Sequence, residues 1–303
     1  MSDDLLTNKN NSQNYISLHV QNETDKLEAV VLGIGTDIGE ESEINPTSKY
    51  HKEEGTYPTE EDIQREISTF EKVLKSQGIE VYRPKNIEGL EQVFTRDIGF
   101  VIDNTYVVAS MQEEVRQMEL PGVNHITNRI DPNHIIHPPK GANVEGGDVI
   151  LWNDHIFVGI SARTNMEGYE FIKTSFPHKQ VHAIPLVVSK DRKKNILHLD
   201  CTFQPIGSKE AIIYENGFAE HPQIIYDLFK EEDMLKVDQA QMNRMFPNIF
   251  SLSPKDIVVE RSFKALIAAL KERGYSVHEV DYTENSKLSG LLRCSTMPLR
   301  RKG

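Results

Sequence analysis

Apolar residues recur at helical spacing in two stretches of the chain, residues 59–77 and 262–273. The positions are Ile63, Ile67, Phe70 and Leu74 in the first stretch and Phe263, Leu266, Ile267 and Leu270 in the second. Intervals of three and four residues place such side chains on one face of a helix. Each stretch ends at a glycine, Gly78 or Gly274, and glycine readily adopts the left-handed conformation that terminates helices. The pattern therefore predicts two units in which a helix is followed by a strand.

A second pattern consists of two β-favouring runs joined by a two-residue turn. Residues 97–102 and 105–110 flank Asp103-Asn104, and residues 148–152 and 155–160 flank Asn153-Asp154. Runs of this kind around turn-forming pairs predict β-hairpins. An aspartate opens each of the two hairpins.

The opening aspartates are part of a longer regularity. Asp97, Asp148 and Asp200 are separated by 51 and 52 residues, and Cys294 follows 94 residues after Asp200, about two shorter units. A fixed period of this size is typical of repeat architectures, although three aspartates can also be spaced this way by coincidence. We predict about five hairpin-plus-helix modules in one closed α/β array, a single catalytic domain over residues 23–303. Residues 1–22 are rich in Asn, Asp, Ser and Gln and are expected to form a loose extension.

The net charge of the chain limits the classes of binding partner that can be expected. The chain has 46 acidic and 34 basic side chains, a formal charge of -12, which disfavours nucleic acid and anionic membranes and suits a cationic ligand. No apolar run approaches the ~20 residues of a membrane span, and the first residues lack a signal-peptide pattern. We therefore expect a cytoplasmic protein, with a homodimer considered as its assembly.

The two cysteines, Cys201 and Cys294, are too few for a disulfide framework, so each needs its own explanation. Residues 196–203 alternate like a half-buried strand, with Cys201 on the apolar face and His198 and Asp200 on the other. The alternation makes Cys201 a core residue and leaves Cys294 as the candidate thiolate, although taken alone Cys294 is equally a core residue.

Acidic residues gather at the openings of the predicted hairpins. Glu145-Gly-Gly-Asp148 places two carboxylates around glycines that let a ligand or backbone approach closely, and Phe94-Thr-Arg-Asp97 adds another acid. Cleavage of a guanidinium needs carboxylates to bind its N–H groups, a thiolate to attack its central carbon and a histidine to move protons. Together Asp97, Asp200, Glu145, His198 and Cys294 supply that set.

On these residues the chain resembles the guanidino-group modifying enzymes, the pentein superfamily, which includes arginine deiminases, dimethylarginine hydrolases and arginine:glycine amidinotransferases. The resemblance runs from about residue 25 to 303. It implies an α/β propeller of five ββαβ modules with pseudo-fivefold symmetry and the active site on its axis. It also implies that Cys294 is the nucleophile, that Glu145 is the partner of His198, and that Asp97 and Asp200 bind the guanidinium.

Further roles follow from the same resemblance. Arg116 and Arg163 match the arginines that hold the substrate's α-carboxylate in deiminases and dimethylarginine hydrolases, and Asp148 is grouped with the substrate-binding residues. The Asp200 carboxylate and the ending Arg-Cys-Ser-Thr-Met-Pro-Leu favour a deiminase-like hydrolase that converts arginine or a related guanidino acid into a ureido product and ammonia. The alternatives are an amidinotransferase, a dimethylarginine hydrolase and a non-catalytic binding protein of the same fold. No metal or organic cofactor is expected.

Overall fold

The computed structural model describes residues 15–40 and 43–303, and these form five three-stranded sheets. The strands, sheet by sheet, are β1 (Lys26–Leu32), β2 (Glu80–Tyr82) and β15 (Thr296–Lys302); β3 (Gly99–Ile102), β4 (Thr105–Val108) and β5 (Ile135–Ile136); β6 (Val149–Trp152), β7 (His155–Ile160) and β8 (Gln180–Pro185); β9 (Phe203–Ile206), β10 (Glu210–Ile213) and β11 (Met234–Lys236); β12 (Phe250–Ser251), β13 (Asp256–Glu260) and β14 (Ser276–Val280).

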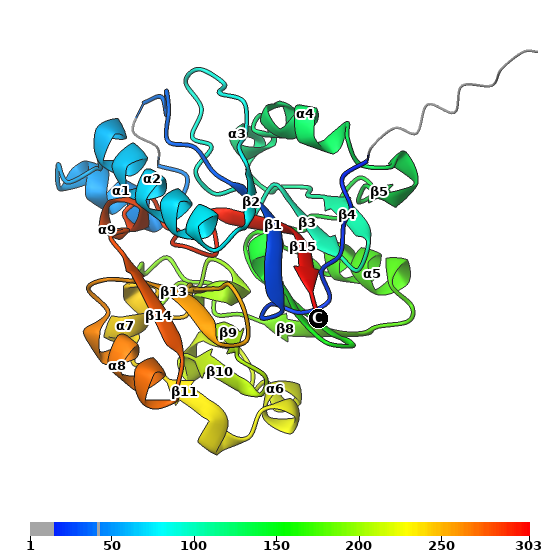
Figure 1. Ribbon diagram of the computed structural model, residues 1–303, viewed down its shortest axis with the longest axis vertical. Coiled ribbons are helices and arrows are strands. Elements are labelled where there is room, and N and C mark those ends of the chain that lie inside the picture. Colours follow the sequence, from blue (N-terminus) through cyan, green and yellow to red (C-terminus); the bar gives the residue numbers. More distant parts are fainter. Residues whose placement is uncertain (1–14, 41–42) are drawn as a thin grey trace, which may run out of the picture.

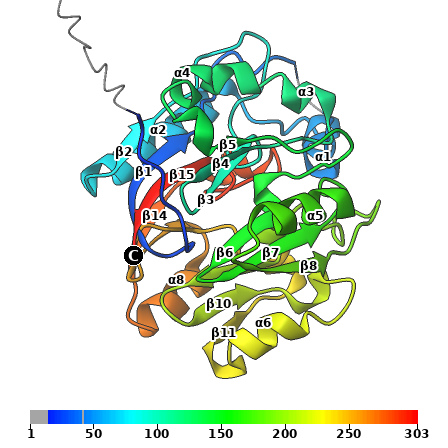
Figure 2. The same ribbon diagram turned by 90° about the vertical axis from the view of Figure 1, so that its right-hand side faces the viewer.

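All five sheets share one topology. The central strand pairs antiparallel with one neighbour and parallel with the other, as β7 does with β6 and β8. Figure 2 shows successive sheets, β3–β5, β6–β8 and β10–β11, following one another down the molecule. The ring closes because β15, the last strand, pairs antiparallel with β1, the first. The predicted five-module α/β propeller is confirmed.

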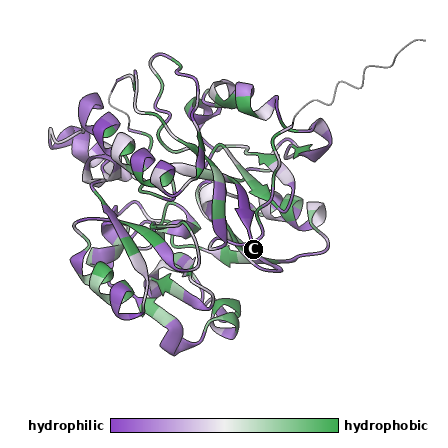
Figure 3. Cartoon of the chain, in the orientation of Figure 1, coloured by the Kyte–Doolittle hydropathy of each residue, from purple (hydrophilic) through white to green (hydrophobic). Residues whose placement is uncertain are grey.

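Helices connect the second and third strands of the modules and lie toward the periphery (Figure 1). The α-helices are α1 (Pro46–Glu53), α2 (Glu60–Ser76), α3 (Glu114–Gln117), α4 (Asn124–Thr127), α5 (Met166–Ser175), α6 (Gln223–Leu228), α7 (Gln239–Asn243), α8 (Lys264–Glu272) and α9 (Thr283–Ser286). Short 3-10 helices are η1 (Leu120–Val123), η2 (Pro132–His134), η3 (Gly146–Asp148), η4 (Leu199–Cys201), η5 (Glu215–Gly217) and η6 (Glu231–Asp233). Figure 3 shows the short outer helix α1 as mostly hydrophilic, in keeping with its single buried residue, Ser48.

The two predicted long helices form with the expected ends. Thr59 caps α2 by accepting a hydrogen bond from the Asp62 backbone N–H, and all four predicted apolar positions of α2 are buried. Gly78 and Gly274 have φ angles of 74° and 85°, the left-handed conformation expected after α2 and α8. In the two predicted hairpins, Asp103 and Asn153 begin the turns with φ angles of 51° and 55°.

Two expectations about local structure are wrong. The described part of the N-terminal segment is not loose, because Ile16, Leu18 and Val20 are buried in a core cluster and Val20 bridges Asp103; residues 1–14 lie outside the described part. Residues 196–203 do not form a half-buried strand either. Leu199 to Cys201 form η4, and β9 begins only at Phe203.

No helix among the described residues is long and apolar enough to cross a membrane.

Candidate active site

The turn ahead of each module's hairpin carries the polar residues that meet at the centre of the ring. Asp97 lies two residues before β3, Glu145 directly before η3, and His198 directly before η4. Cys294 lies two residues before β15, the strand that closes the ring. The modules thereby bring together residues far apart in the sequence, such as Arg96 and Arg293, which are separated by 197 positions.

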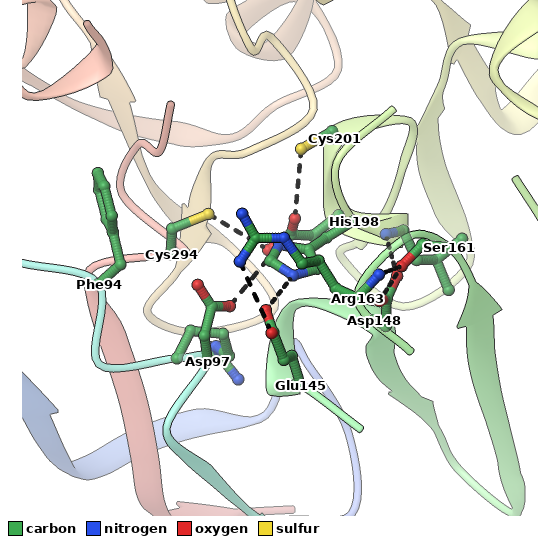
Figure 4. A network of polar contacts seen from close by, with 12 residues as sticks. Phe94, Asp97, Glu145, Asp148, Ser161, Arg163, His198, Cys201 and Cys294 are labelled. Carbon is green, nitrogen blue, oxygen red and sulfur yellow. Dashed lines mark hydrogen bonds and ion pairs between the residues drawn. The ribbon is translucent and has the colours of Figure 1, made fainter. Parts of the chain in front are cut away.

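Figure 4 shows the resulting cluster, in which Cys294, Asp97, His198 and Glu145 point toward one another. Their side chains are almost completely buried, with exposed fractions of 0 to 3%. The sequence-predicted nucleophile, histidine and acids are therefore assembled in one place.

His198 is held from one side only. Its Nε2 lies 2.8 Å from Glu145 Oε2, while its Nδ1 lies 3.7 Å from Asp97 Oδ1. Among the described residues neither His198 Nδ1 nor Asp97 Oδ1 has a hydrogen-bond partner, although both atoms are buried. Two such atoms side by side are ready to bind a polar ligand, because buried polar groups are normally satisfied.

The charges around His198 favour its protonated form. Burial would lower the pKa of His198, but Asp97, Asp148 and Glu145 outweigh that effect and raise the pKa to about 10. Burial likewise opposes ionisation of Asp97, yet His198 and Arg116 hold the pKa of this carboxyl below its usual range. The site therefore rests with an imidazolium beside a carboxylate.

Asp200 separates the two cysteines. Its Oδ2 lies 3.6 Å from Cys294 Sγ, and its Oδ1 lies 3.7 Å from Cys201 Sγ. Arg293, which is fully buried, donates from Nη1 to the same Oδ2 at 2.9 Å and is itself held by Glu23. Burial, together with the Asp200 and Asp97 carboxylates, raises the pKa of the Cys294 thiol well above its usual range.

Cys201 is buried in a core cluster, as predicted, but not for the predicted reason. Residues 199–201 form η4, so there is no alternating strand to place Cys201 on an apolar face. The Cys201 sulfur also contacts a polar atom, Asp200 Oδ1. A small cavity of about 40 Å³, lined among others by Leu197, Met242 and Ser289, lies behind it.

Asp148 is held by two contacts inside the protein, and its assignment to substrate binding stays a prediction. Its Oδ1 accepts from the Leu199 backbone N–H at 2.9 Å, and its Oδ2 accepts from Ser161 Oγ at 2.7 Å. Burial raises the pKa of Asp148 to about 7, with opposing contributions that include His198. Oδ1 of Asp148 thus fixes η4, the turn between His198 and the strand that follows, while Oδ2 holds Ser161.

Arg116 is also held by contacts inside the protein. It donates from Nη1 to Asp97 Oδ2 and from Nη2 to the Phe94 carbonyl, both at 3.0 Å, and it forms an ion pair with Glu119. A guanidinium committed to these acceptors positions Asp97. One of its partners, Glu119, lies only three residues away on the same segment, and binding of a substrate carboxylate by Arg116 stays a prediction.

Arg163 is buried, and Figure 4 shows its guanidinium reaching into the cluster beside Glu145. Its Nη1 is 3.8 Å from Glu145 Oε1, and its Nη2 donates to the Ile44 backbone carbonyl at 3.0 Å. A backbone carbonyl is a replaceable acceptor, so Arg163 keeps the capacity to bind an anion.

Residues that the sequence did not single out complete the site. Asn248 is fully buried and hydrogen-bonds Cys294, and the Arg293–Glu23 pair fixes Asp200. Gly147 matters by its lack of a side chain, because an added Cβ would lie 2.7 Å from His198 Nδ1 and 2.8 Å from Asp97 Oδ1. The paired glycines of Glu145-Gly-Gly-Asp148 signalled such a close approach, whereas nothing in the sequence marks Asn248.

Asp97, Glu145 and His198 also present oxygen and nitrogen atoms within 4.8 Å of one another, a spacing that suits a cation. A protonated histidine is not a metal ligand, and Glu145 already accepts from the ring. The arrangement suits an organic cation whose N–H groups are donors, because Asp97 Oδ1 is an acceptor without a donor in the described chain.

Comparison with known proteins identifies the relatives of this arrangement. The family model for N,N-dimethylarginine dimethylhydrolase, eukaryotic, matches residues 38–301. The uncharacterized protein YkgA of Bacillus subtilis is 31% identical over 261 residues, covering 85% of this chain and 86% of YkgA. The arginine deiminase of Bacillus cytotoxicus is 24% identical over 284 residues, covering 79% of this chain and 69% of the deiminase.

Solved structures share the fold at low sequence identity. The N-terminal domain of ArgZ, an arginine dihydrolase from the ornithine-ammonia cycle in cyanobacteria, was solved with bound substrate and superposes with a TM-score of 0.79 at 20% identity, covering 90% of this chain and 98% of that domain. The inosamine-phosphate amidinotransferase StrB1 of Streptomyces griseus has a TM-score of 0.77 at 18% identity, covering 95% and 98%. The chain belongs to the family described by the dimethylarginine dimethylhydrolase model, within the pentein superfamily of guanidino-group modifying enzymes.

Proposed function

We propose that the protein hydrolyses the guanidino group of arginine or a related guanidino acid, giving a ureido product and ammonia. The observation that carries this proposal is the unsatisfied pair Asp97 Oδ1 and His198 Nδ1 next to the Cys294 thiol. A guanidinium bound there donates N–H groups to Asp97 and brings its carbon to the sulfur. Its positive charge also offsets the negative charge of the surrounding carboxylates.

The reaction uses the contacts of the resting site. The Cys294 thiol releases its proton to solvent as the cation binds, and the thiolate sulfur forms a bond to the guanidinium carbon. The bond from that carbon to one terminal nitrogen breaks, and the nitrogen leaves as ammonia with a proton from the free Nδ1 of His198. The product of this half-reaction is an S-alkylthiouronium on Cys294.

In the second half-reaction, the hydrolysis of the thiouronium, His198 acts as a base instead of an acid. The now neutral His198 takes one proton from water, and the oxygen adds to the same carbon. The carbon–sulfur bond then breaks, the second water proton passes to solvent, and the ureido product and the thiolate are released. Glu145, which holds Nε2 at 2.8 Å, keeps the ring oriented and stabilises its charge in both steps. Each atom of the guanidinium is accounted for without a cofactor.

Two carboxylates near the sulfur favour an unsubstituted guanidinium. Asp97 and Asp200 both need N–H donors, and methyl groups on a terminal nitrogen replace donors by carbon. A dimethylarginine hydrolase is the second candidate, because the family model that spans residues 38–301 is named for that activity. Its leaving group is dimethylamine in place of ammonia.

Arg163 is proposed to bind the carboxylate of the substrate. It lies beside Glu145, and its Nη2 is paired with a neutral carbonyl at Ile44. An anionic group is a stronger partner for a guanidinium than a carbonyl, since charge-assisted hydrogen bonds are about twice as strong.

Product analysis decides among these activities. The protein is incubated with arginine, with asymmetric dimethylarginine, and with arginine plus glycine or lysine, and the products are separated by mass spectrometry. Citrulline with ammonia from arginine supports the proposal, and citrulline with dimethylamine as the efficient reaction supports the second candidate. Ornithine with a new guanidino compound and no ammonia refutes hydrolysis and indicates an amidinotransferase. Absence of turnover and of any adduct on Cys294 with a haloacetamidine indicates a binding protein.

A further inference from the structure

Asn248 makes two hydrogen bonds to Cys294. The Cys294 backbone N–H donates to Asn248 Oδ1 at 3.2 Å, and Asn248 Nδ2 donates to Cys294 Sγ at 3.1 Å. The first bond fixes the orientation of the amide, because a backbone N–H can only face its oxygen. The amide nitrogen is thereby directed at the sulfur, and Asn248 has no exposed surface.

Asn248 occupies a position in its module that corresponds to the positions of Asp97 and Cys294 in theirs. Asn248 lies two residues before β12, as Asp97 lies two residues before β3 and Cys294 two residues before β15. These turns point toward the centre of the ring. The fifth module therefore contributes Asn248 where other modules contribute an acid or the nucleophile.

The other groups that face the sulfur disfavour a thiolate. Asp200 lies 3.6 Å away, and Asp97, Cys201 and Tyr282 are close enough to interact electrostatically. Arg293, the residue that precedes Cys294, is bonded to Asp200 and Glu23. Among the described side chains, the Nδ2 group of Asn248 is the donor within hydrogen-bonding distance of Cys294 Sγ.

We propose that Asn248 is a catalytic residue that donates its Nδ2–H to the thiolate of Cys294. A hydrogen bond to the ionised form of a group stabilises that form, and such bonds strengthen when the acceptor carries a charge. The same donor serves twice, when the thiolate attacks and when it is released from the thiouronium, and Asn248 itself gains or loses no proton. The inference rests on the proposed function in which Cys294 is the nucleophile.

A purely structural Asn248 is the competing explanation, and Asn248→Asp separates the two. This variant keeps the size of the side chain and an oxygen for the Cys294 N–H, but it replaces the Nδ2 donor with a second oxygen. Because the aspartate also adds a carboxylate beside the sulfur, Asn248→Leu carries the comparison, since it removes both hydrogen bonds at similar volume without adding a charge. Asn285→Leu is the matched control, since Asn285 is also fully buried but bonds Glu66 and the Ile63 carbonyl.

The test follows alkylation of Cys294 by iodoacetamide across pH, quantified on its own peptide by mass spectrometry, together with kcat and KM. Loss of a hydrogen bond to a charged group predicts an alkylation rate at pH 8 and a kcat lowered by roughly 10- to 100-fold, with KM changed by less than about threefold. The alkylation profile should move to higher pH in both Asn248 variants and stay in place in Asn285→Leu. A folded Asn248 variant with the parental alkylation profile and kcat overturns the proposal.

The alkylation arm needs no substrate, so it keeps the two proposals distinguishable. If the parent protein turns over none of the guanidino compounds, the proposed function fails, while the shift in alkylation still reports whether Asn248 stabilises the thiolate. If the parent turns over arginine and the Asn248 variants alkylate as the parent does, only the role of Asn248 fails.

Discussion

Replacement of Asp200 by asparagine should make Cys294 more reactive and the enzyme less active. In the resting site the Asp200 Oδ2 lies 3.6 Å from Cys294 Sγ, and a thiolate at that distance from a carboxylate is strongly disfavoured. Asparagine keeps an oxygen that accepts from Arg293 but removes the charge. The substrate guanidinium, in contrast, loses one of the two carboxylates that attract it.

The distance sets the size of the effect. Two unit charges 3.6 Å apart interact by about 4–5 kcal/mol at an effective dielectric constant of about 20. Arg293 bonds the same oxygen and offsets part of this repulsion, so we take about half, roughly 2 kcal/mol. That energy corresponds to an increase of roughly thirtyfold in the thiolate population, and hence in alkylation rate, below the titration midpoint.

The assay compares iodoacetamide alkylation of the Cys294 peptide with kcat/KM for arginine. We expect the alkylation rate of Asp200→Asn to rise about thirtyfold at pH 8, while kcat/KM falls by roughly 100-fold because a charge-assisted hydrogen bond to the substrate is lost. Glu170→Gln, which removes an exposed carboxylate on α5, serves as the control and should change neither. An unchanged or lower alkylation rate in folded Asp200→Asn would refute the electrostatic reasoning.

Four further expectations follow from the same geometry. Cys294→Ser should lower turnover at least a thousandfold, whereas Cys201→Ser should retain most of it, as citrulline assays of both would show. Because the pKa of the Cys294 thiol is raised by burial and by nearby carboxylates, kcat/KM should increase with pH through the neutral range. It should then decline above about pH 10, where His198, whose pKa is raised to about 10, loses its proton; an optimum at acidic pH would contradict this. Arg163→Gln should raise KM for arginine by roughly 10- to 100-fold but leave agmatine, which has no carboxylate, within about threefold; equal effects on both would exclude carboxylate binding. Gly147→Ala should abolish turnover and lower the melting temperature, because the added Cβ meets the buried His198 ring at 2.7 Å and overpacking destabilises, and a fully active variant would show that this space is not used.

The hairpin-plus-helix module could be predicted from the sequence because the patterns that specify it involve residues close together in the chain. The spacing of apolar residues in α2 and α8, the glycines that follow them and the two-residue turns all act within a few residues. Repetition of the opening aspartate then indicated a ring, and pairing of β1 with β15 is the closure that a repeat array requires.

The same local signals failed at residues 196–203. Alternation of apolar and polar residues predicted a strand, but the Leu199 N–H bonds Asp148 Oδ1, 51 residues earlier, and the segment folds into η4 instead. A contact between modules therefore determines the local conformation, and no window of neighbouring residues contains it. The contacts of Arg116 with Asp97 and of Asp148 with Leu199 were not predicted for a related reason, since these partners lie 19 and 51 residues away in the sequence.

The site residues lie on turns, so the strands that form the fold are distinct from the residues that carry the chemistry. The strands β3, β6, β9 and β12 begin just after the site residues, so the sheets fix where each turn lies without supplying a reactive group themselves. Each acid is held by an arginine through one oxygen, Asp97 by Arg116 and Asp200 by Arg293. Asp97 keeps its Oδ1 without a partner, and the Asp200 Oδ2 that bonds Arg293 also faces Cys294. In the proposed reaction a bound cation offsets the negative charge of both carboxylates and so lowers the free energy needed to ionise the nearby Cys294 thiol. Binding and activation of the nucleophile are thus one event, and a neutral ligand of the same shape should occupy the site without producing a thiolate.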